Sequence, residues 1–135
     1  MRQKYVLTLE DARRVAAAAH RSALENDWKV AIAIVDDGGH LQYFERLDDV
    51  QLGSVVVAIE KAKTAVAFRR PSQALESAIA GGRTVMLKLP GSTPIEGGVP
   101  LIHEGQVVGA IGVSGVQSHQ DGIIAQAGAA ALAEV

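Results

Sequence analysis

The chain has 135 residues, 48% of them hydrophobic, and its 13 basic and 15 acidic residues leave a formal net charge of -2. A chain of this length can bury roughly two thirds of its unfolded surface, so we expect one globular domain spanning residues 1–135. The near-neutral charge argues against nucleic-acid binding, and the absence of cysteine excludes disulfides, thiolate metal sites and cysteine nucleophiles.

The first predicted element is a helix that begins after Thr8 and ends near residues 26–27. Thr8 suits the N-cap position, and Glu10 and Asp11 place acidic side chains in the first turn. His20 lies at the shoulder of the apolar stripe of this helix. The stripe recurs at helical spacing and consists of Leu9, Ala12, Val15, Ala16, Ala19 and Ala23.

A β-hairpin is predicted next, with strands over residues 29–36 and 40–47. Asp37-Gly38 between them is a strong signal for a type I′ turn. This two-residue turn pairs Ile34 with Leu41 and Ile32 with Tyr43 on a bulky face. The opposite face of the hairpin is smaller and holds Ala31, Ala33 and Val35 together with Phe44, Gln42 and His40.

A helix over residues 54–68 follows, with Lys61 and Lys63 expected in solvent. Pro71 ends it, and Ser72 is expected to cap a short helix that continues to about Ile79. Residues 84–89 are predicted as a short strand, and residues 90–98 as an exposed loop rich in Pro and Gly. The predicted inward residues of the longer helix are Val55, Ala58, Ile59, Ala62, Ala65 and Val66.

The second predicted hairpin spans residues 97–115 and turns at Glu104-Gly105. A two-residue turn there places Ile102 opposite Val107 and Leu101 opposite Val108. The long strand then has a bulky face, with Val107, Ile111 and Val113, and a small face, with Val108, Ala110, Gly112 and Ser114. Such a run of small residues in a strand indicates that a backbone or a ligand packs unusually close.

A final Ala-rich helix is predicted from about Asp121 to Glu134, capped by residues 118–121. Two hairpins of similar design, together with the intervening helices, predict an α+β domain. The expected architecture is a single antiparallel sheet of about five strands flanked by α-helices, a layered arrangement like that of profilin.

Several motifs, in this order, resemble those of the GlcG/HbpS family, which includes the C-terminal domain of PduO. The resemblance covers nearly the whole chain, and the ordered set is more specific than any one piece. The motifs are Asp36-Asp37-Gly38-Gly39-His40, Lys61-Ala62-Lys63-Thr64-Ala65, Phe68-Arg69-Arg70-Pro71, Gly97-Gly98-Val99-Pro100 and Gly109-Ala110-Ile111-Gly112-Val113-Ser114-Gly115, with Asp121 after them.

This resemblance implies the same layered fold and a homo-oligomer, dimer or higher. Some members of the family bind haem, one is an accessory protein of a haem-linked sensor, and others sit beside organic-acid or diol metabolism. Fold transfers well across such a resemblance, whereas function transfers poorly.

His20 is the candidate haem ligand, because PduO-like members carry a haem-linked His on the first helix and this position looks similar. A neutral imidazole is a common axial ligand, and the neighbouring Ala16, Ala17 and Ala19 would leave room for a flat porphyrin. A His from each of two subunits could give six-coordinate iron at an interface. The other three histidines, at positions 40, 103 and 119, fit the sheet margin, a turn and a helix cap instead.

The alternative site is the loop from Glu96 to Pro100. The amides of Gly97 and Gly98 could bind a carboxylate. Glu96 or Asp121 would then act as acid or base, with Arg69, Arg83 or Lys63 supplying positive charge. On this hypothesis the protein is a small enzyme that transfers a proton on an organic acid. The competing explanation is that the glycines let the loop pass close to a helix and that Asp121 caps the last helix.

Two functions therefore remain open: a haem or tetrapyrrole binding protein using His20, Gly97 and Gly98, and a metabolic enzyme or accessory subunit using Glu96, Arg69 and Asp121. No apolar run approaches the ~20 residues that span a bilayer, and the N-terminus lacks a signal-peptide core. We expect a cytoplasmic protein whose partners are itself and a small molecule, not a membrane.

Overall fold

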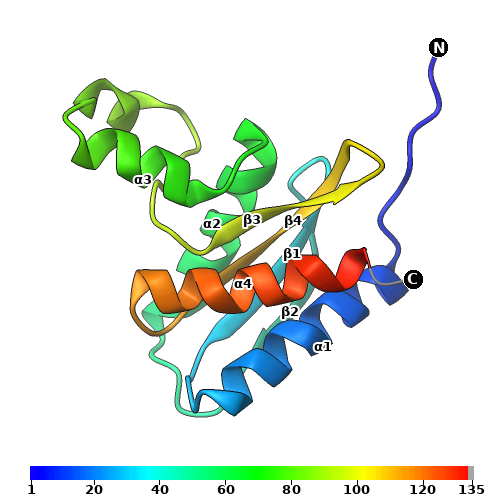
Figure 1. The fold of residues 1–135 in the computed structure, drawn as a ribbon, viewed down its shortest axis with the longest axis horizontal. Coiled ribbons are helices and arrows are strands. Elements are labelled where there is room, and N and C mark those ends of the chain that lie inside the picture. The colour runs from blue at the N-terminus through cyan, green and yellow to red at the C-terminus, as the bar shows by residue number, and fades with distance from the viewer. Residues whose placement is uncertain (134–135) are drawn as a thin grey trace.

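The chain folds into three layers, with helices on both faces of a four-stranded antiparallel sheet (Figure 1). The computed structural model describes residues 1–133. Strands far apart in sequence meet at the sheet centre, where the first strand pairs with the last. The elements are α1 (Leu9–Glu25), β1 (Ala31–Asp36), β2 (Leu41–Arg46), α2 (Gly53–Phe68), α3 (Ser72–Ala80), the 3-10 helix η1 (Thr84–Lys88), β3 (Gly98–His103), β4 (Gln106–Ser114) and α4 (Ser118–Leu132), and the strand order is β2-β1-β4-β3.

Helix α1 begins and ends as the sequence predicts. The Thr8 side chain accepts a hydrogen bond from the Asp11 amide, and the Asp11 carboxylate accepts one from the Thr8 amide, which completes a capping box. Asn26 is the C-cap. The predicted apolar stripe is buried apart from Leu9, which is exposed because it lies in the first turn, outside the contact with the sheet.

The bulky face of the sheet packs against α1 and α4, which lie side by side across it (Figure 1). Ile32 and Ile34 of β1 and Ile111 and Val113 of β4 are fully buried there. This layer holds the larger share of the apolar core, because its cluster of buried side chains is larger than the one on the other face. Burying one such side chain contributes roughly 1.5–3 kcal/mol.

The small face of the sheet packs against α2, so a helix backbone occupies the space that the small residues leave. A Cβ atom added at Gly112 would overlap the Ala58 carbonyl oxygen, and one added at Gly98 would overlap the Lys61 carbonyl oxygen. Ala33 and Ala110 line the same layer. The sequence left open whether a backbone or a ligand approaches this face, and the structure shows a backbone.

The first hairpin has a longer turn than predicted. The Asp36 carboxylate accepts hydrogen bonds from the Gly38 and His40 amides, and Gly39 adopts a positive φ of 82°. With a bulge at residues 34–35, this turn pairs Ile34 with Tyr43 rather than with Leu41, so the predicted register is wrong. Over residues 31–34 the slip is two residues, an even number, so the predicted faces survive there: Tyr43 packs with Ile32 and Ile34. Beyond the bulge the slip is one residue, and Leu41 pairs with Val35 of the small face.

The second hairpin turns at Glu104-Gly105 as predicted, and both residues have positive φ. Ile102 pairs with Val107 as expected, but a bulge then pairs Leu101 with Gly109 instead of Val108. A slip of one residue exchanges the two faces. Val107 therefore packs toward α2 and Val108 toward α1, the reverse of the prediction, whereas the faces of residues 110–113 are as predicted.

The sheet has four strands instead of about five, because residues 84–89 do not form a strand. They form η1, closed by local hydrogen bonds from the Met86 amide to the Arg83 carbonyl and from the Leu89 amide to the Met86 carbonyl. Val85 and Leu87 are exposed. A short apolar run does not by itself distinguish a strand from a helical turn, and this one lies beside α3, away from any sheet edge.

The remaining boundaries differ by a few residues. Helix α4 begins at Ser118 with Gln117 as N-cap, three residues before the prediction, and its predicted end at Glu134 lies outside the described residues. Pro71 is the N-cap of α3, and the Ser72 hydroxyl instead donates to the Ile95 carbonyl and accepts from the Gly98 amide. Within residues 1–133, no helix is both long and apolar enough to cross a bilayer.

Candidate functional site

His20 lies near the end of α1 and faces β2. Its Nδ1 atom is 2.8 Å from the Glu45 Oε2 atom, and its side chain is 37% exposed. When Nδ1 donates this hydrogen bond, Nε2 carries the free lone pair of the ring. This is the arrangement in which a carboxylate fixes the tautomer of a metal-binding imidazole.

A pocket of about 220 Å³ opens beside His20, between the end of α1 and the segment that follows β2. The half-buried Trp28 and Leu47 and the exposed Leu24 supply apolar surface, and Asp27 and Lys29 form an ion pair at its rim. Ala16 and Ala19 do not face this pocket, because both are buried in the core. Ala17 is exposed but does not line this pocket, so the room beside His20 in one chain comes from the loop after α1.

The other three histidines lie where the sequence placed them, and apart from one another. His40 follows the β1–β2 turn, 82% exposed, and its ring lies 3.3 Å from the Asp36 carboxylate. His103 stacks edge-on against Tyr5 at the β3–β4 turn, and His119 is exposed on α4. Within the described part of the chain, no three His, Asp or Glu side chains come together to hold a bare metal ion.

The loop from Glu96 to Pro100 is tightly packed. Gly97, Gly98 and Pro100 are buried, and Lys61 fills the space beside both glycines. The Glu96 side chain lies against Gly122, at the start of α4. Close packing therefore accounts for the two glycines without a ligand, which is the competing explanation that the sequence offered.

A buried ion pair joins Lys61 of α2 to Asp121 of α4. The Lys61 ammonium is 3.0 Å from the Asp121 carboxylate and 3.0 Å from the Val113 carbonyl oxygen, and the two side chains are 2% and 3% exposed. The other Asp121 carboxylate oxygen accepts a hydrogen bond from the Val116 amide. Burial raises the pKa of the Asp121 carboxyl, and the adjacent ammonium and amide groups offset only part of this shift.

This pair corrects two predictions. Lys61 is buried instead of solvated, because its ammonium finds a carboxylate and a carbonyl inside the protein. Asp121 does more than cap a helix, because it neutralises that ammonium. Helical spacing already held a signal: Ala58, Lys61 and Ala65 lie on one face of α2, and both alanines were predicted to be buried.

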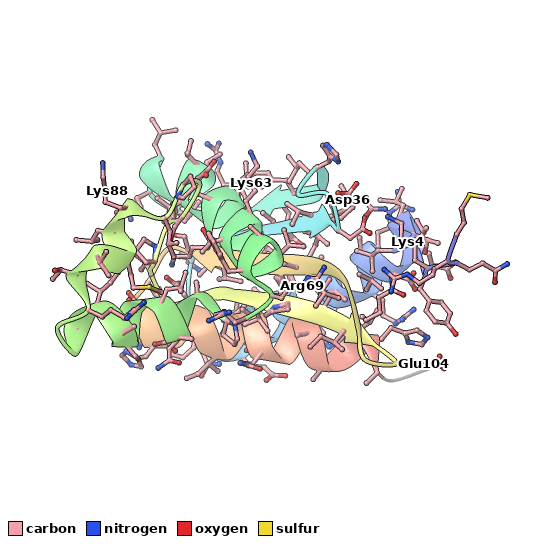
Figure 2. All side chains as sticks on the ribbon, turned by 90° about the horizontal axis from the view of Figure 1, so that it is seen from above. Lys4, Asp36, Lys63, Arg69, Lys88 and Glu104 are labelled. Carbon is pink, nitrogen blue, oxygen red and sulfur yellow. The ribbon has the colours of Figure 1, made fainter. Side chains whose placement is uncertain are left out.

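The structure does not bring Arg69 to the residues of the alternative site. Arg69 lies at the end of α2 and lines a pocket with Gly105 and Val107, at the turn end of the β3–β4 hairpin. Glu96 precedes the opposite end of β3. Lys63 points outward from α2 (Figure 2), 3.8 Å from Glu60. Arg83 is exposed.

Glu45 is the residue of the His20 site that the sequence did not suggest. Its role depends on a contact between α1 and β2, 25 positions apart in the chain. Side chains alternate along a strand, so Glu45 lies on the same side of β2 as Tyr43, the side that α1 covers. This alternation is the sequence signal that could have placed Glu45 near α1.

Comparison with known proteins agrees with this fold and its layered sheet. The family model described as "Haem degrading protein HbpS-like" matches residues 7–130. The chain belongs to the HbpS-like family. This confirms the resemblance that the sequence motifs indicated.

Among HbpS-like relatives, the protein GlcG of Escherichia coli K12 is 41% identical over 114 residues, which cover 84% of this chain and 85% of GlcG. The crystal structure of a Streptomyces reticuli HbpS double mutant has a TM-score of 0.87 at 34% identity, covering 96% of this chain and 89% of that one. A crystal structure of a PduOC–heme complex has a TM-score of 0.84 at 30% identity, covering 94% and 95%.

Proposed function

We propose that this chain binds haem or a related tetrapyrrole at a surface that includes His20, with His20 as an axial ligand. Two comparisons support this proposal: the matching family model is described as a haem-degrading protein, and the PduOC relative was crystallised as a complex with heme. The single observation that carries it is the hydrogen bond between His20 and Glu45, which leaves Nε2 available for coordination.

The residues around His20 fit such a group. Neutral imidazole is an ordinary haem ligand, and a carboxylate on its other nitrogen raises its basicity and holds the ring in place. Trp28, Leu24 and Leu47 offer apolar contacts to a macrocycle. Bound haem would supply an iron centre there. The chain supplies the axial ligand, its orientation and an apolar wall.

A second copy of the chain is the expected cover for this surface. The pocket of about 220 Å³ is smaller than the roughly 300–1,000 Å³ of typical ligand sites, so one subunit encloses only part of a porphyrin. The homo-oligomer, the cytoplasmic location and the role of His20 remain predictions. No contact among residues 1–133 favours the alternative proton-transfer enzyme, since Asp121 is paired with Lys61 and Arg69 lies elsewhere.

The first prediction concerns hemin titration followed at the Soret band. The unmodified protein is expected to shift the band with saturable binding, and His20→Ala is expected to abolish the shift. Glu45→Ala leaves the ligand but removes its hydrogen-bond partner, so it is expected to weaken binding by about tenfold or more.

His119→Ala is the matched control, because it removes an exposed histidine from α4 and is expected to leave the titration unchanged. Circular dichroism and thermal melting would show that each variant is folded. A Soret shift of unchanged size and affinity in folded His20→Ala would refute the assigned role of His20.

A further inference from the structure

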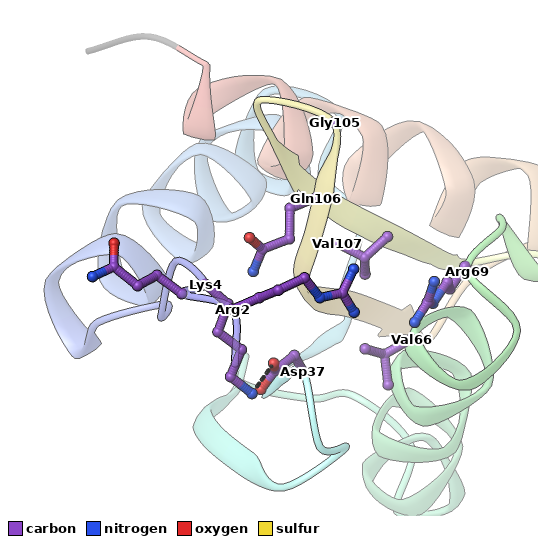
Figure 3. Close-up of a pocket in the computed structure, with 9 residues that line it drawn as sticks. Arg2, Lys4, Asp37, Val66, Arg69, Gly105, Gln106 and Val107 are labelled. Atoms are coloured by element: carbon purple, nitrogen blue, oxygen red, sulfur yellow. Dashed lines mark hydrogen bonds and ion pairs between the residues drawn. The ribbon is translucent and has the colours of Figure 1, made fainter.

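We propose a second ligand site, separate from His20: a basic pocket at the turn end of the β1–β2 hairpin that binds a small organic dianion of the dicarboxylate class. The pocket has a volume of about 740 Å³ and is walled by four segments that are far apart in sequence (Figure 3). These are the N-terminal segment, the β1–β2 turn, the β3–β4 turn and the end of α2. His20 contacts Glu45, which pairs with Ile32 at the other end of this hairpin.

The pocket concentrates positive charge in a protein whose net charge is -2. Arg2, Lys4 and Arg69 line it against a single carboxylate, that of Asp37. Lys4 is 2.8 Å from Asp37, and this ion pair neutralises both groups. The guanidinium groups of Arg2 and Arg69 remain, and neither forms an ion pair with another group in residues 1–133. Clustering like charges in a concave site raises the local concentration of anions.

The apolar surface of the pocket indicates an organic anion instead of an inorganic one. Figure 3 shows the Arg2 side chain extending across the pocket toward Val66 and Val107, with Arg69 on their far side. A guanidinium binds a carboxylate through two parallel hydrogen bonds. Two guanidiniums separated by valine side chains therefore suit a molecule with two carboxylates joined by a short hydrocarbon body.

The backbone of Arg69 gives independent support. Arg69 has φ 52° and ψ 42°, the left-handed conformation in which a helix usually ends with Gly. A residue with a side chain is strained there, and such strain is typical of functional positions. Figure 2 shows Arg69 at the end of α2, toward the segment that carries Lys4.

The helix end itself weakens the positive potential only slightly. The C-terminus of an α-helix carries about half a negative charge, and α2 ends beside this pocket. Two full guanidinium charges exceed that partial charge. The net field in the pocket therefore favours an anion.

Isothermal titration of the full chain with succinate at low ionic strength tests the proposal, with uncharged succinamide as the matched probe. Succinate is expected to bind and succinamide is not. Arg69→Gly is expected to weaken succinate binding by about tenfold or more, the loss expected for one charge-assisted pair. The same variant is expected to melt at an equal or higher temperature, because Gly suits the left-handed conformation.

Arg70→Ala is the control, since it removes the same charge one residue away without lining the pocket. It is expected to bind succinate nearly as well as the unmodified chain. Equal succinate affinity in Arg69→Gly and the unmodified chain would overturn the proposal, as would binding of inorganic phosphate but not succinate.

Hemin titration of Arg69→Gly separates this site from the His20 site. We expect an unchanged Soret titration, because the two sites lie at opposite ends of the β1–β2 hairpin. Loss of hemin binding in this variant would show that the pocket serves the tetrapyrrole and would overturn a separate dicarboxylate site. Failure of hemin to bind the unmodified chain would leave the succinate result standing.

Discussion

At the scale of single residues, we expect the buried Lys61–Asp121 pair to have the largest effect on the free energy of unfolding when one partner is removed. Both charges are almost completely removed from water, so each depends on the other and on backbone groups for its stabilisation. Removing one partner of such a pair typically costs about 3–5 kcal/mol, whereas replacing both with apolar groups is often neutral.

Asp121→Asn is therefore expected to lower the free energy of unfolding by about 3 kcal/mol, because it leaves a buried ammonium without its carboxylate. The double variant Lys61→Met/Asp121→Asn is expected to recover most of this loss. Urea unfolding of the four proteins in this cycle measures the coupling. Additive effects of the two substitutions would contradict a strong interaction.

The pH dependence of Lys61→Met provides a second readout of this pair. Without the ammonium, burial leaves the pKa of Asp121 still further above its unfolded value. The folded state then binds the proton of Asp121 more tightly than the unfolded state does. The contribution of Asp121 to stability is therefore greatest at low pH and is lost as pH rises through the folded-state pKa of this carboxyl. The deficit of Lys61→Met relative to the unmodified chain is expected to grow between pH 4 and pH 7.

Sequence patterns could locate these residues only in part. Helical spacing put Lys61 on the buried face of α2, yet a lysine is normally assigned to solvent because burying its charge is costly. Only the partner makes the burial possible, and Asp121 lies 60 positions away. His20 was proposed from its place on the first helix and the resemblance to PduO-like members, whereas its hydrogen-bond partner Glu45 depends on the packing of α1 on β2.

At the scale of elements, the close packing of α2 against the small face of the sheet determines which residues are tolerated. Gly112 faces the backbone of the helix at Ala58 and Ala62 with no side chain between them. An added methyl group there requires the helix or the strand to move.

Gly112→Ala is accordingly expected to destabilise the protein by about 1–3 kcal/mol, the usual cost of overfilling a packed core. Gly53→Ala is the matched control, because nothing lies within 4 Å of its added Cβ and the site opens α2. That substitution is expected to be neutral or slightly stabilising. Thermal unfolding compares the two, and equal melting temperatures would contradict the close approach of α2.

The two hairpins show that the sequence pattern predicts the turns but not the exact pairing of the strands. The sequence located both turns correctly, but each strand pair also contains a bulge that the residue types at those positions did not predict. A two-residue slip preserved the predicted faces of the first hairpin over residues 31–34, and a one-residue slip in the second exchanged the faces of Val107 and Val108. Register depends on turn geometry and on packing from both sides, and single-strand alternation does not contain that information.

At the scale of the whole molecule, the layered α+β fold followed from the sequence because periodicity, turn signals and family motifs agreed. The predicted fifth strand is absent because residues 84–89, a short apolar run, lie beside α3 and outside the sheet. The two pockets could not be predicted, since each is assembled from segments that only the folded chain brings together.

The outer face of α2 provides the last prediction, which concerns assembly. Leu52 and Val56 are 78% and 63% exposed, although the inner face of the same helix is already packed on the sheet. An apolar helix surface of this kind is typical of a subunit contact. Light scattering is expected to give a mass that is a multiple of one chain, and Val56→Glu is expected to lower it.

Val85→Glu is the comparison variant for this experiment, because it places the same charge on an equally exposed residue of η1. It is expected to leave the mass unchanged. A single-chain mass for the unmodified protein would contradict the predicted homo-oligomer.

The position of Lys61 affects how the fold can unfold in part. Lys61 abuts β3 through its carbonyl group, and its ammonium binds β4 and α4. If α2 detached alone, the buried Asp121 carboxylate would lose its ammonium partner, and the small face of the sheet would be exposed to water. Detachment of α2 alone is therefore costly, and the three layers are expected to melt as one cooperative unit.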